Sequence, residues 1–180
     1  MLYKERAFGV KDDMRLTLRS ANTNDTAAFL VLLQELCTDT PFSPYTLDEC
    51  IDEQKLAQKI ESFALQENRM LLLAEENGKL IGYASIRPLA DLQKTKHRGL
   101  YEGAVLKHYW GYGVGSLLTK ELFAYAEQMQ FSQFEADVFA DNRRAIEMYT
   151  QLGFEEWARI KKAYKTEHDF IDQLHLGKEI

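Results

Sequence analysis

The chain has 180 residues, of which 46% are hydrophobic and 28% are charged, and its formal net charge is −6. This length and composition are typical of a single globular domain with a substantial core. The acidic balance excludes nucleic-acid binding by bulk electrostatic attraction, although not through a local basic patch, and no apolar run approaches the roughly 20 residues that span a membrane.

The first third of the chain predicts an arm, one strand and two helices. Residues 1–13 are mixed in charge and lack the apolar core of a signal peptide, so we expect an arm of uncertain structure. Met14–Arg19 alternates and predicts a strand. Asn24 or Asp25 can cap the first helix, and Thr46-x-x-Glu49 is a capping-box pattern that predicts the start of the second. The apolar positions of these helices are Phe29, Leu33, Leu36 and Cys37, then Leu56, Ile60 and Phe63.

The middle of the chain predicts three strands in succession. Met70–Ala74 is a continuous apolar run, which is typical of a buried strand. Asn77-Gly78 is the strongest short hairpin signal, and it leads into a strand over Leu80–Arg87. A polar loop separates this strand from the next, over Gly99–Val105.

A glycine-rich turn after Val105 is the most informative part of the sequence. Gly111, Gly113 and Gly115 occupy alternate positions, and an amphipathic helix follows at once. Glycines let bare backbone approach a ligand closely. The free N–H groups and the helix dipole at such a helix start favour a phosphate. We therefore expect this turn to bind a phosphorylated molecule.

The remaining elements complete a mixed sheet. Phe134–Phe139 predicts a strand, and Asp141-Asn142 begins a short helix that ends at Gly153. Two final strands are expected near Trp157–Tyr164 and Asp169–Leu176. This order of elements predicts an α/β fold of the α+β kind, with one mixed sheet and helices on both of its faces.

No metal site is expected. Cys37 and Cys50 lack metal-ligand spacing, so we interpret them as small buried hydrophobes within helices. The histidines at 108, 168 and 175 also lack such spacing. This use of cysteine fits a reducing compartment, and the cytoplasm is the expected location.

Three phosphate-binding motifs can be compared with the turn. A P-loop needs a Lys-Ser/Thr pair after its last glycine, whereas Ser116-Leu117 follows Gly115. A dinucleotide fingerprint needs a third glycine where Ser116 stands. The stretch instead resembles the acetyl-CoA loop of the GNAT superfamily of N-acetyltransferases, Arg/Gln-x-x-Gly-x-Gly/Ala. Gly113-x-Gly115 matches its glycines, while Trp110 stands where the family usually has Arg or Gln. A dinucleotide site, or a turn without a ligand, remains an alternative.

A second block resembles the same family. The family pattern Asn-x-x-Ala-Ile-x-x-Tyr-x-x-x-Gly-Phe is matched by Asn142, Ala145, Ile146, Tyr149, Gly153 and Phe154. The resemblance runs from about Met14 to the C-terminus and implies a single N-acetyltransferase domain over 14–180. It implies a GNAT-like acyl-CoA N-acyltransferase fold, whose mostly antiparallel sheet of about 6–7 strands is flanked by about four helices. The residues His97, Asp141-Asn142 and Phe170-Ile171-Asp172 are similar to a branch of small bacterial-type acetyltransferases, some of which act on free amino acids or related small amines.

The resemblance also implies catalytic residues. Tyr149 is the expected general acid for the leaving CoA thiolate, although helix spacing alone favours a core aromatic. Glu102 is the expected general base, directly or through water, and its alternative is a surface or ion-paired carboxylate. His97 is the rival base, because an imidazole titrates near neutral pH.

Further residues are expected to bind acetyl-CoA. The backbone of Val105, Leu106 and Lys107 would pair with the pantetheine arm, as a strand edge can pair with an amide-bearing ligand. The pyrophosphate would be held by the amides of Tyr112, Gly113, Val114, Gly115 and Ser116. Asn142 would contact CoA in the family, but it can also cap its helix.

The resemblance implies an enzyme that acetylates a primary amine of a small molecule or amino acid, with acetyl-CoA as cosubstrate. Acetylation of a protein N-terminus or lysine is one alternative, and a non-catalytic CoA-binding sensor module is another. No nucleic acid or membrane partner is expected, and dimers are common in the superfamily. The acceptor, its binding loops and the role of Trp110 cannot be read from the sequence.

Overall fold

The computed structural model describes residues 2–49 and 52–180, so Cys50, with its expected place in a helix, lies outside the described residues. The chain divides into two compact units, residues 1–87 with 103–130 and residues 88–102 with 131–180. These are unit 1 and unit 2, respectively. The prediction of one domain over 14–180 stays a prediction.

The fold is a mixed α/β structure, as predicted, with eight strands in the order β1-β2-β3-β4-β5-β6-β8-β7 rather than six to seven. Strands β5 and β6 pair in parallel, whereas β1/β2, β2/β3, β3/β4, β6/β8 and β7/β8 are antiparallel. The strands of the described chain are β1 (Arg6–Gly9), β2 (Arg15–Ser20), β3 (Met70–Glu76), β4 (Lys79–Pro88), β5 (Arg98–Val105), β6 (Gln133–Phe139), β7 (Glu155–Lys165) and β8 (Phe170–Glu179). The α-helices are α1 (Thr26–Asp39), α2 (Glu53–Leu65), α3 (Val114–Ala126) and α4 (Arg143–Gln151).

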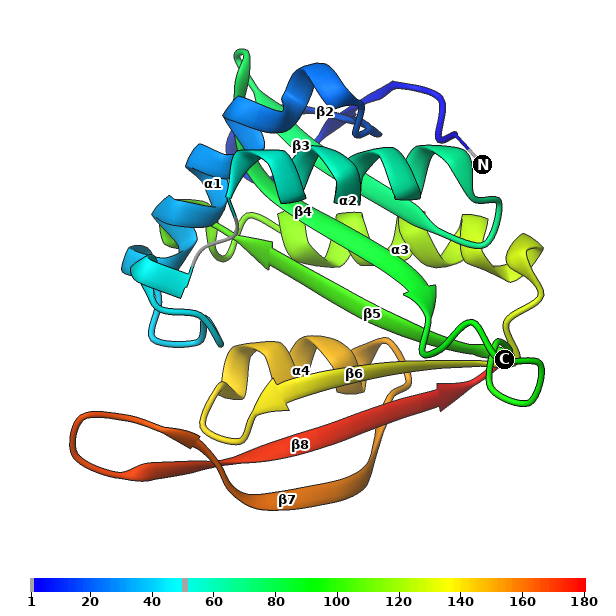
Figure 1. Cartoon of the computed structure of the whole chain (residues 1–180). Coiled ribbons are helices and arrows are strands. Elements are labelled where there is room, and N and C mark those ends of the chain that lie inside the picture. The colour runs from blue at the N-terminus through cyan, green and yellow to red at the C-terminus, as the bar shows by residue number, and fades with distance from the viewer. Residues whose placement is uncertain (1, 50–51) are drawn as a thin grey trace. The chain divides into compact units, whose positions relative to one another are not determined.

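Unit 1 has its sheet between two helical layers. Figure 1 shows α1 and α2 in front of β3 and β4, with α3 behind these strands. The odd-numbered side chains Leu71 and Leu73 of β3 belong to the core under α1 and α2, so strand alternation turns Leu72 toward α3. The predicted helical face Leu56, Ile60 and Phe63 is buried in that core. The predicted hairpin is confirmed, because Asn77 and Gly78 adopt positive φ angles of 50° and 82°.

Three local predictions in unit 1 are corrected. The arm contains strand β1, whose burial is slight and whose ordering comes from its pairing with β2. Asp25, one of the two expected candidates, is the N-cap residue of α1, but its side chain makes no capping bond to that helix. The side-chain cap belongs to Asn22, which accepts from the N–H of Asn24 and begins the 3-10 turn Thr23–Asp25 before α1. Thr46 and Glu49 do bond to each other, but they enclose a single 3-10 turn. Helix α2 is capped by Asp52, which accepts from the N–H of Lys55.

Two side chains of the arm, Tyr3 and Arg6, also hold it to α3. Tyr3 is buried, its hydroxyl donates to Glu121 at 2.7 Å, and its ring lies 4.9 Å from that of Tyr125. Arg6 forms an ion pair with the same Glu121 at 3.0 Å. The first residues are thus part of unit 1.

Unit 2 combines β6, β7, β8 and the start of β5 with α4. Its apolar side is formed by Phe134, Ala136 and Val138 of β6 with Leu174 and Leu176 of β8, all buried. Strand β7 lies at the edge and shows two register shifts against β8, around Trp157 and between Ile160 and Tyr164. The Trp157 ring lies over Gly177, where there is no room for a Cβ. Any side chain at this position of β8 would force the Trp157 ring to move.

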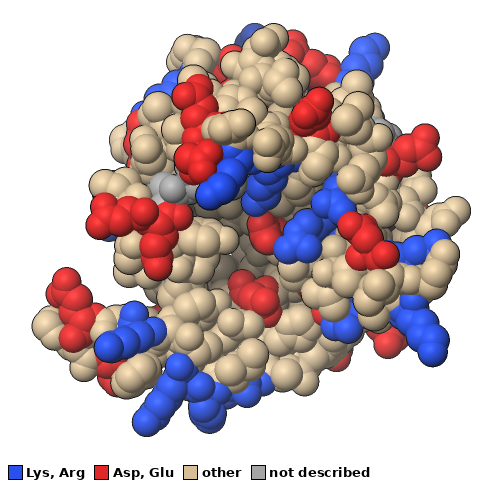
Figure 2. Space-filling model, viewed as in Figure 1, with Lys and Arg blue, Asp and Glu red and all other residues tan. Residues whose placement is uncertain are grey.

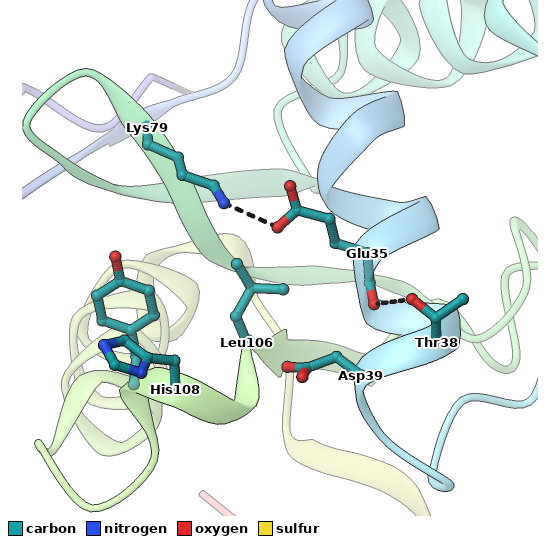
Figure 3. Close-up of a pocket in the computed structure, with 7 residues that line it drawn as sticks. Glu35, Thr38, Asp39, Lys79, Leu106 and His108 are labelled. Atoms are coloured by element: carbon teal, nitrogen blue, oxygen red, sulfur yellow. Dashed lines mark hydrogen bonds and ion pairs between the residues drawn. The ribbon is translucent and has the colours of Figure 1, made fainter.

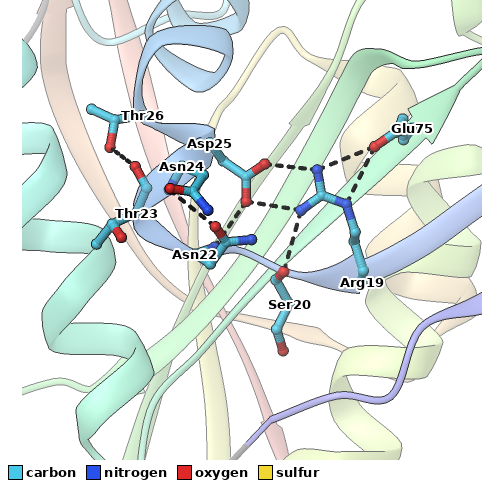
Figure 4. A network of polar contacts seen from close by, with 8 residues as sticks. All are labelled: Arg19, Ser20, Asn22, Thr23, Asn24, Asp25, Thr26 and Glu75. Atoms are coloured by element: carbon cyan, nitrogen blue, oxygen red, sulfur yellow. Dashed lines mark hydrogen bonds and ion pairs between the residues drawn. The ribbon is translucent and has the colours of Figure 1, made fainter.

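A polar network joins β2, β3 and the start of α1 in unit 1 (Figure 4). The guanidinium of Arg19 donates to both carboxylate oxygens of Asp25, at 2.7 and 2.8 Å, and to Glu75 at 3.1 Å. Asp25 also accepts from the N–H of Asn22. Burial acts to raise the pKa of the Asp25 carboxyl, but the hydrogen bonds from Arg19 and Asn22 outweigh it, so the pKa lies below its usual value.

Replacement of Asp25 by asparagine should lower the free energy of unfolding at pH 7 by about 1–3 kcal/mol, because charge-assisted bonds to Arg19 are lost. A depressed carboxyl pKa contributes stability above its unfolded value near 4, and this contribution is lost as the pH falls through the folded pKa. Urea unfolding of wild type and Asp25→Asn at pH 7 and pH 3 should therefore show a gap that shrinks in acid. A gap of equal size at both pH values would contradict this assignment.

Candidate active site

The glycine turn lies in unit 1 and leads directly into α3. Gly111 and Gly113 adopt φ angles of 86° and 88°, a left-handed conformation that glycine adopts without strain. Gly113 is the N-cap, and its carbonyl accepts the first bond of the helix, from the N–H of Leu117 at 2.9 Å. The backbone N–H groups of the first turn, before Leu117, have no carbonyl group within the helix to which they could donate. A Cβ on Gly113 would meet nothing within 4 Å, so the turn opens to space.

The backbone of the segment Val105–Lys107 is largely engaged within the protein. The N–H of Leu106 donates to Ile81 at 2.9 Å, and the N–H of Lys107 donates to the Asp39 carboxylate. The carbonyls of Leu106 and Lys107 accept from Tyr109 and Trp110. The carbonyl of Val105 accepts from the indole Nε1 of Trp110 at 2.7 Å. Pairing of this segment with a pantetheine arm therefore has to exchange some of these bonds.

A pocket of about 420 Å³ lies in unit 1 beside this segment (Figure 3). The C-terminal turns of α1 contribute Glu35 and Asp39, and the close-up shows the Glu35 carboxylate directed toward Lys79, with an ion pair of 2.9 Å. Tyr109 donates its hydroxyl to Glu76 at 2.9 Å, and burial together with that carboxylate raises the pKa of the phenol. The full lining is Glu35, Thr38, Asp39, Lys79, Leu106, His108 and Tyr109.

The aromatic residues Phe42 and Tyr45, which follow α1, are not part of this lining. Tyr45 is instead largely exposed. The pocket is formed where the end of α1 meets the chain that leaves β5. The sequence contains no spacing signal for this meeting, because the two segments are about 70 residues apart.

Tyr149 and Asn142 lie on α4 in unit 2. Asn142 caps the helix, since its side-chain oxygen accepts from the N–H of Ala145 at 3.2 Å. Tyr149 is buried, and its ring packs against those of Phe154 and Tyr101, at centroid distances of 5.2 and 5.8 Å. The structure thus confirms the structural role that was the alternative for each residue: Asn142 caps a helix, and Tyr149 is a core aromatic. Neither role excludes contact with a ligand.

Glu102 lies next to Tyr101 on β5 and is half-buried. Because successive side chains of a strand point to opposite faces and Tyr101 packs on Tyr149, Glu102 points away from Tyr149. Strand β5 pairs with β6 only over Arg98–Leu100, so Glu102 lies beyond that ladder. His97 is exposed just before the strand, and a strand rise of about 3.3 Å per residue separates it from Glu102 by roughly 16 Å along the chain.

Unit 2 also contains a buried ionic cluster that was not anticipated from the sequence. Glu135 on β6 is fully buried and accepts two bonds from Arg98, at 2.5 and 2.6 Å. Gln133 donates to it at 2.6 Å, and His175 bridges it to Asp137 at 3.0 and 2.8 Å. Burial acts to raise the pKa of the Glu135 carboxyl, but the bonds from Arg98 and Gln133 outweigh it and lower the pKa.

Among the described residues, the surface charges and the helices give no sign of a nucleic-acid, membrane or metal site. Figure 2 shows basic and acidic side chains interspersed on the visible face rather than gathered into a field of one sign. Within residues 2–49 and 52–180, no helix has the length and apolar character required to cross a bilayer. In the same residues, no group of three or more His, Cys, Asp or Glu side chains is arranged to hold a metal ion.

Comparison with known proteins gives one family. The model of the "Acetyltransferase (GNAT) family" matches residues 30–154. An acetyltransferase of the GNAT family from Streptococcus pneumoniae superposes with a TM-score of 0.87 at 27% identity, over 92% of this chain and 99% of that one. A GNAT phosphinothricin acetyltransferase from Sinorhizobium meliloti, solved in complex with acetyl-CoA, gives 0.81 at 19% identity, over 92% and 88%, which shows likeness of fold alone.

Among curated proteins, the aminoglycoside N(6')-acetyltransferase type 1 of Acinetobacter haemolyticus is 26% identical over 67% of this chain and 92% of its own. The chain spans only about half the length of other curated relatives that it matches, at 57%, 43% and 55% of their lengths.

Proposed function

The chain belongs to the acetyltransferase (GNAT) family, and from this premise we propose that it transfers the acetyl group of acetyl-CoA to a primary amine of a small molecule or amino acid. The observation that carries the proposal is the turn that ends at Gly113, whose surroundings are open at the start of α3. Backbone amides at a helix start are suited to the pyrophosphate of CoA. The proposed pyrophosphate ligands are the amides of Tyr112, Gly113, Val114, Gly115 and Ser116.

We further propose that Tyr149 and Glu102 carry the proton transfers. The amine nitrogen attacks the thioester carbonyl, the C–S bond breaks, and the thiolate takes a proton from the Tyr149 phenol. The nitrogen releases its proton to Glu102, directly or through water. The family model covers both residues, and Glu102 is half-buried on β5 rather than fully exposed, which supports these roles. The exposed His97, at the far end of the strand, is the less suitable base.

The size and chemistry of the unit 1 pocket support a small acceptor. Its volume of about 420 Å³ falls within the range of small-molecule sites, roughly 300–1,000 Å³. Glu35 is paired with Lys79, so the Asp39 carboxylate is the lining charge that favours a cationic group, and an amine acceptor is cationic before it loses its proton. The name of the Acinetobacter relative indicates that its acceptor is an aminoglycoside. Aminoglycosides are also small molecules that carry amino groups.

The direct test is an assay of purified protein with acetyl-CoA and a panel of amines, with free CoA thiol as the readout. Thiol release that depends on a small amine or amino acid supports the proposal. Release only with peptides would favour acetylation of a protein N-terminus or lysine. Tight CoA binding without transfer to any acceptor would favour a sensor module. Gel filtration of the same sample would address a homodimer, and a cytoplasmic location is proposed from the use of cysteine.

Replacement of Gly113 by alanine should raise the dissociation constant of CoA by about 10-fold, equivalent to roughly 1.4 kcal/mol. A Cβ at φ 88° both strains the turn and stands in the open space from which a phosphate would approach. Isothermal titration with CoA measures the effect.

The matched control for this prediction is Gly78→Ala. Gly78 has a φ of 82° and equally open surroundings, but it lies in the β3–β4 hairpin. This variant should show a similar loss of stability and wild-type affinity for CoA. Equal affinities for wild type and Gly113→Ala would remove the turn from the donor site.

A further inference from the structure

Trp110 stands where the family pattern has Arg or Gln, and two hydrogen bonds fix its position. It lies immediately before Gly111, and its indole N–H donates to the carbonyl of Val105 at 2.7 Å. Its own backbone N–H donates to Lys107 at 3.1 Å. The side chain therefore closes the loop between the last residue of β5 and the glycine turn.

The end of β5, to which Trp110 is bonded, is itself held from two directions. Strand β4 approaches so closely at Gly82 that an added Cβ would lie 2.8 Å from the carbonyl oxygen of Ala104. The bonds of Leu106 to Ile81 and of Lys107 to Asp39 add β4 and α1 as supports. A side chain that bonds to Val105 is thus attached to a fixed point.

The turn on the other side of Trp110 has far more conformational freedom. Gly111 and Gly113 both occupy positive φ, and glycine loses more backbone entropy than any other residue when it is held in one conformation. A bond that fixes the residue before Gly111 removes part of this freedom before a ligand arrives. Pre-organisation of this kind raises affinity without any new contact to the ligand.

We propose that Trp110 is a positioning residue for acetyl-CoA, which holds the glycine turn against β5 through its indole N–H. The inference rests on the proposed donor site. Trp110 acts through the amides of the turn and touches no reacting atom. Its removal is therefore expected to weaken CoA binding and to raise KM for acetyl-CoA, while kcat changes little.

The test compares Trp110→Phe, Trp110→Gln and Trp157→Phe with wild type. Phenylalanine keeps an aromatic ring but has no N–H, whereas glutamine retains a side-chain donor without adding charge. Trp157→Phe is the matched control, since Trp157 is the other tryptophan of the chain and lies in unit 2. We expect Trp110→Phe to raise Kd for CoA and KM for acetyl-CoA by about 5- to 10-fold. Trp110→Gln should recover most of the loss, and Trp157→Phe should match wild type.

Hydrogen exchange provides a readout that does not depend on activity. Peptides that cover Gly111–Ser116 should exchange faster in ligand-free Trp110→Phe than in wild type, whereas those of the β3–β4 hairpin should not change. Wild-type values of Kd, KM and exchange in Trp110→Phe would overturn the proposal, as would a Trp110→Gln variant that is as weak as Trp110→Phe. If wild type itself does not bind CoA, the proposed function fails instead. Should Trp110→Phe not fold, recovery of folding and affinity in Trp110→Gln still decides the role of the donor.

Discussion

Replacement of Arg98 by methionine is expected to lower the free energy of unfolding by roughly 3 kcal/mol. The change leaves the fully buried carboxylate of Glu135 without the two bonds that Arg98 donates at 2.5 and 2.6 Å. Removal of one partner of a buried ion pair is costly because an uncompensated charge remains in the interior. The loss stays at the low end of the usual range because Gln133 and His175 still face Glu135. Urea unfolding at pH 7 measures it.

The double variant Arg98→Met/Glu135→Leu is the control for this prediction. It removes both charges, so no buried carboxylate is left without a cation, and it should be more stable than Arg98→Met alone. A partly exposed Arg98 also predicts a smaller loss for Glu135→Gln, since the freed guanidinium can reach water. If the free energy of unfolding of Arg98→Met lies within about 1 kcal/mol of the wild-type value, the ion pair does not stabilise unit 2 appreciably.

Replacement of Tyr149 by phenylalanine is expected to lower kcat by at least about 10-fold, because a positioned general acid commonly contributes 10²- to 10⁴-fold. The phenyl ring keeps the contacts with Tyr101 and Phe154, so the core of unit 2 should remain intact. Steady-state kinetics with the amine identified in the panel assay measures the change. Thermal unfolding of the same variant checks that the fold is retained.

Tyr101→Phe is the matched control for this experiment. It removes a hydroxyl from the same buried aromatic cluster, but from a residue with no proposed chemical role. It should retain wild-type kcat. A Tyr149→Phe variant with unchanged kcat would show that Tyr149 is a packing residue alone, and the general acid would have to be sought elsewhere.

The elements that were predicted well are those whose pattern reflects burial along one segment. Leu56, Ile60 and Phe63 repeat at helical spacing because one face of α2 enters the core, and Asn77-Gly78 turns because of its own backbone preferences. Strand β1 was missed because it has little buried surface and is ordered by β2. Asp25 is the N-cap residue of α1, but its carboxylate makes no capping bond because it accepts from Arg19 on β2, a partner that local sequence does not indicate.

In the candidate site, too, the residues with local requirements could be predicted, and those brought together by the fold could not. The glycine turn and Asn142 could be located from local sequence, since a positive φ and a helix cap are local requirements. The Arg98–Glu135–His175 cluster could not, because its members lie on three strands and no spacing joins them. Two acidic residues in the otherwise apolar strand Phe134–Phe139 were the one available hint. Trp110 was noticed only as a mismatch, and its bond to Val105 gives it a physical reason.

The two register shifts of β7 bear on self-association. The strand is eleven residues long and lies at the edge of the sheet, where an unpaired row of N–H and C=O groups can nucleate aggregates by adding strands from other molecules. The shifts leave regular pairing only at Glu155–Glu156, Ala158–Ile160 and Tyr164–Lys165, and Lys162 at φ 52° bends the backbone between the last two. A foreign strand therefore meets no regular run longer than three residues, and we expect this edge to resist amyloid-like growth.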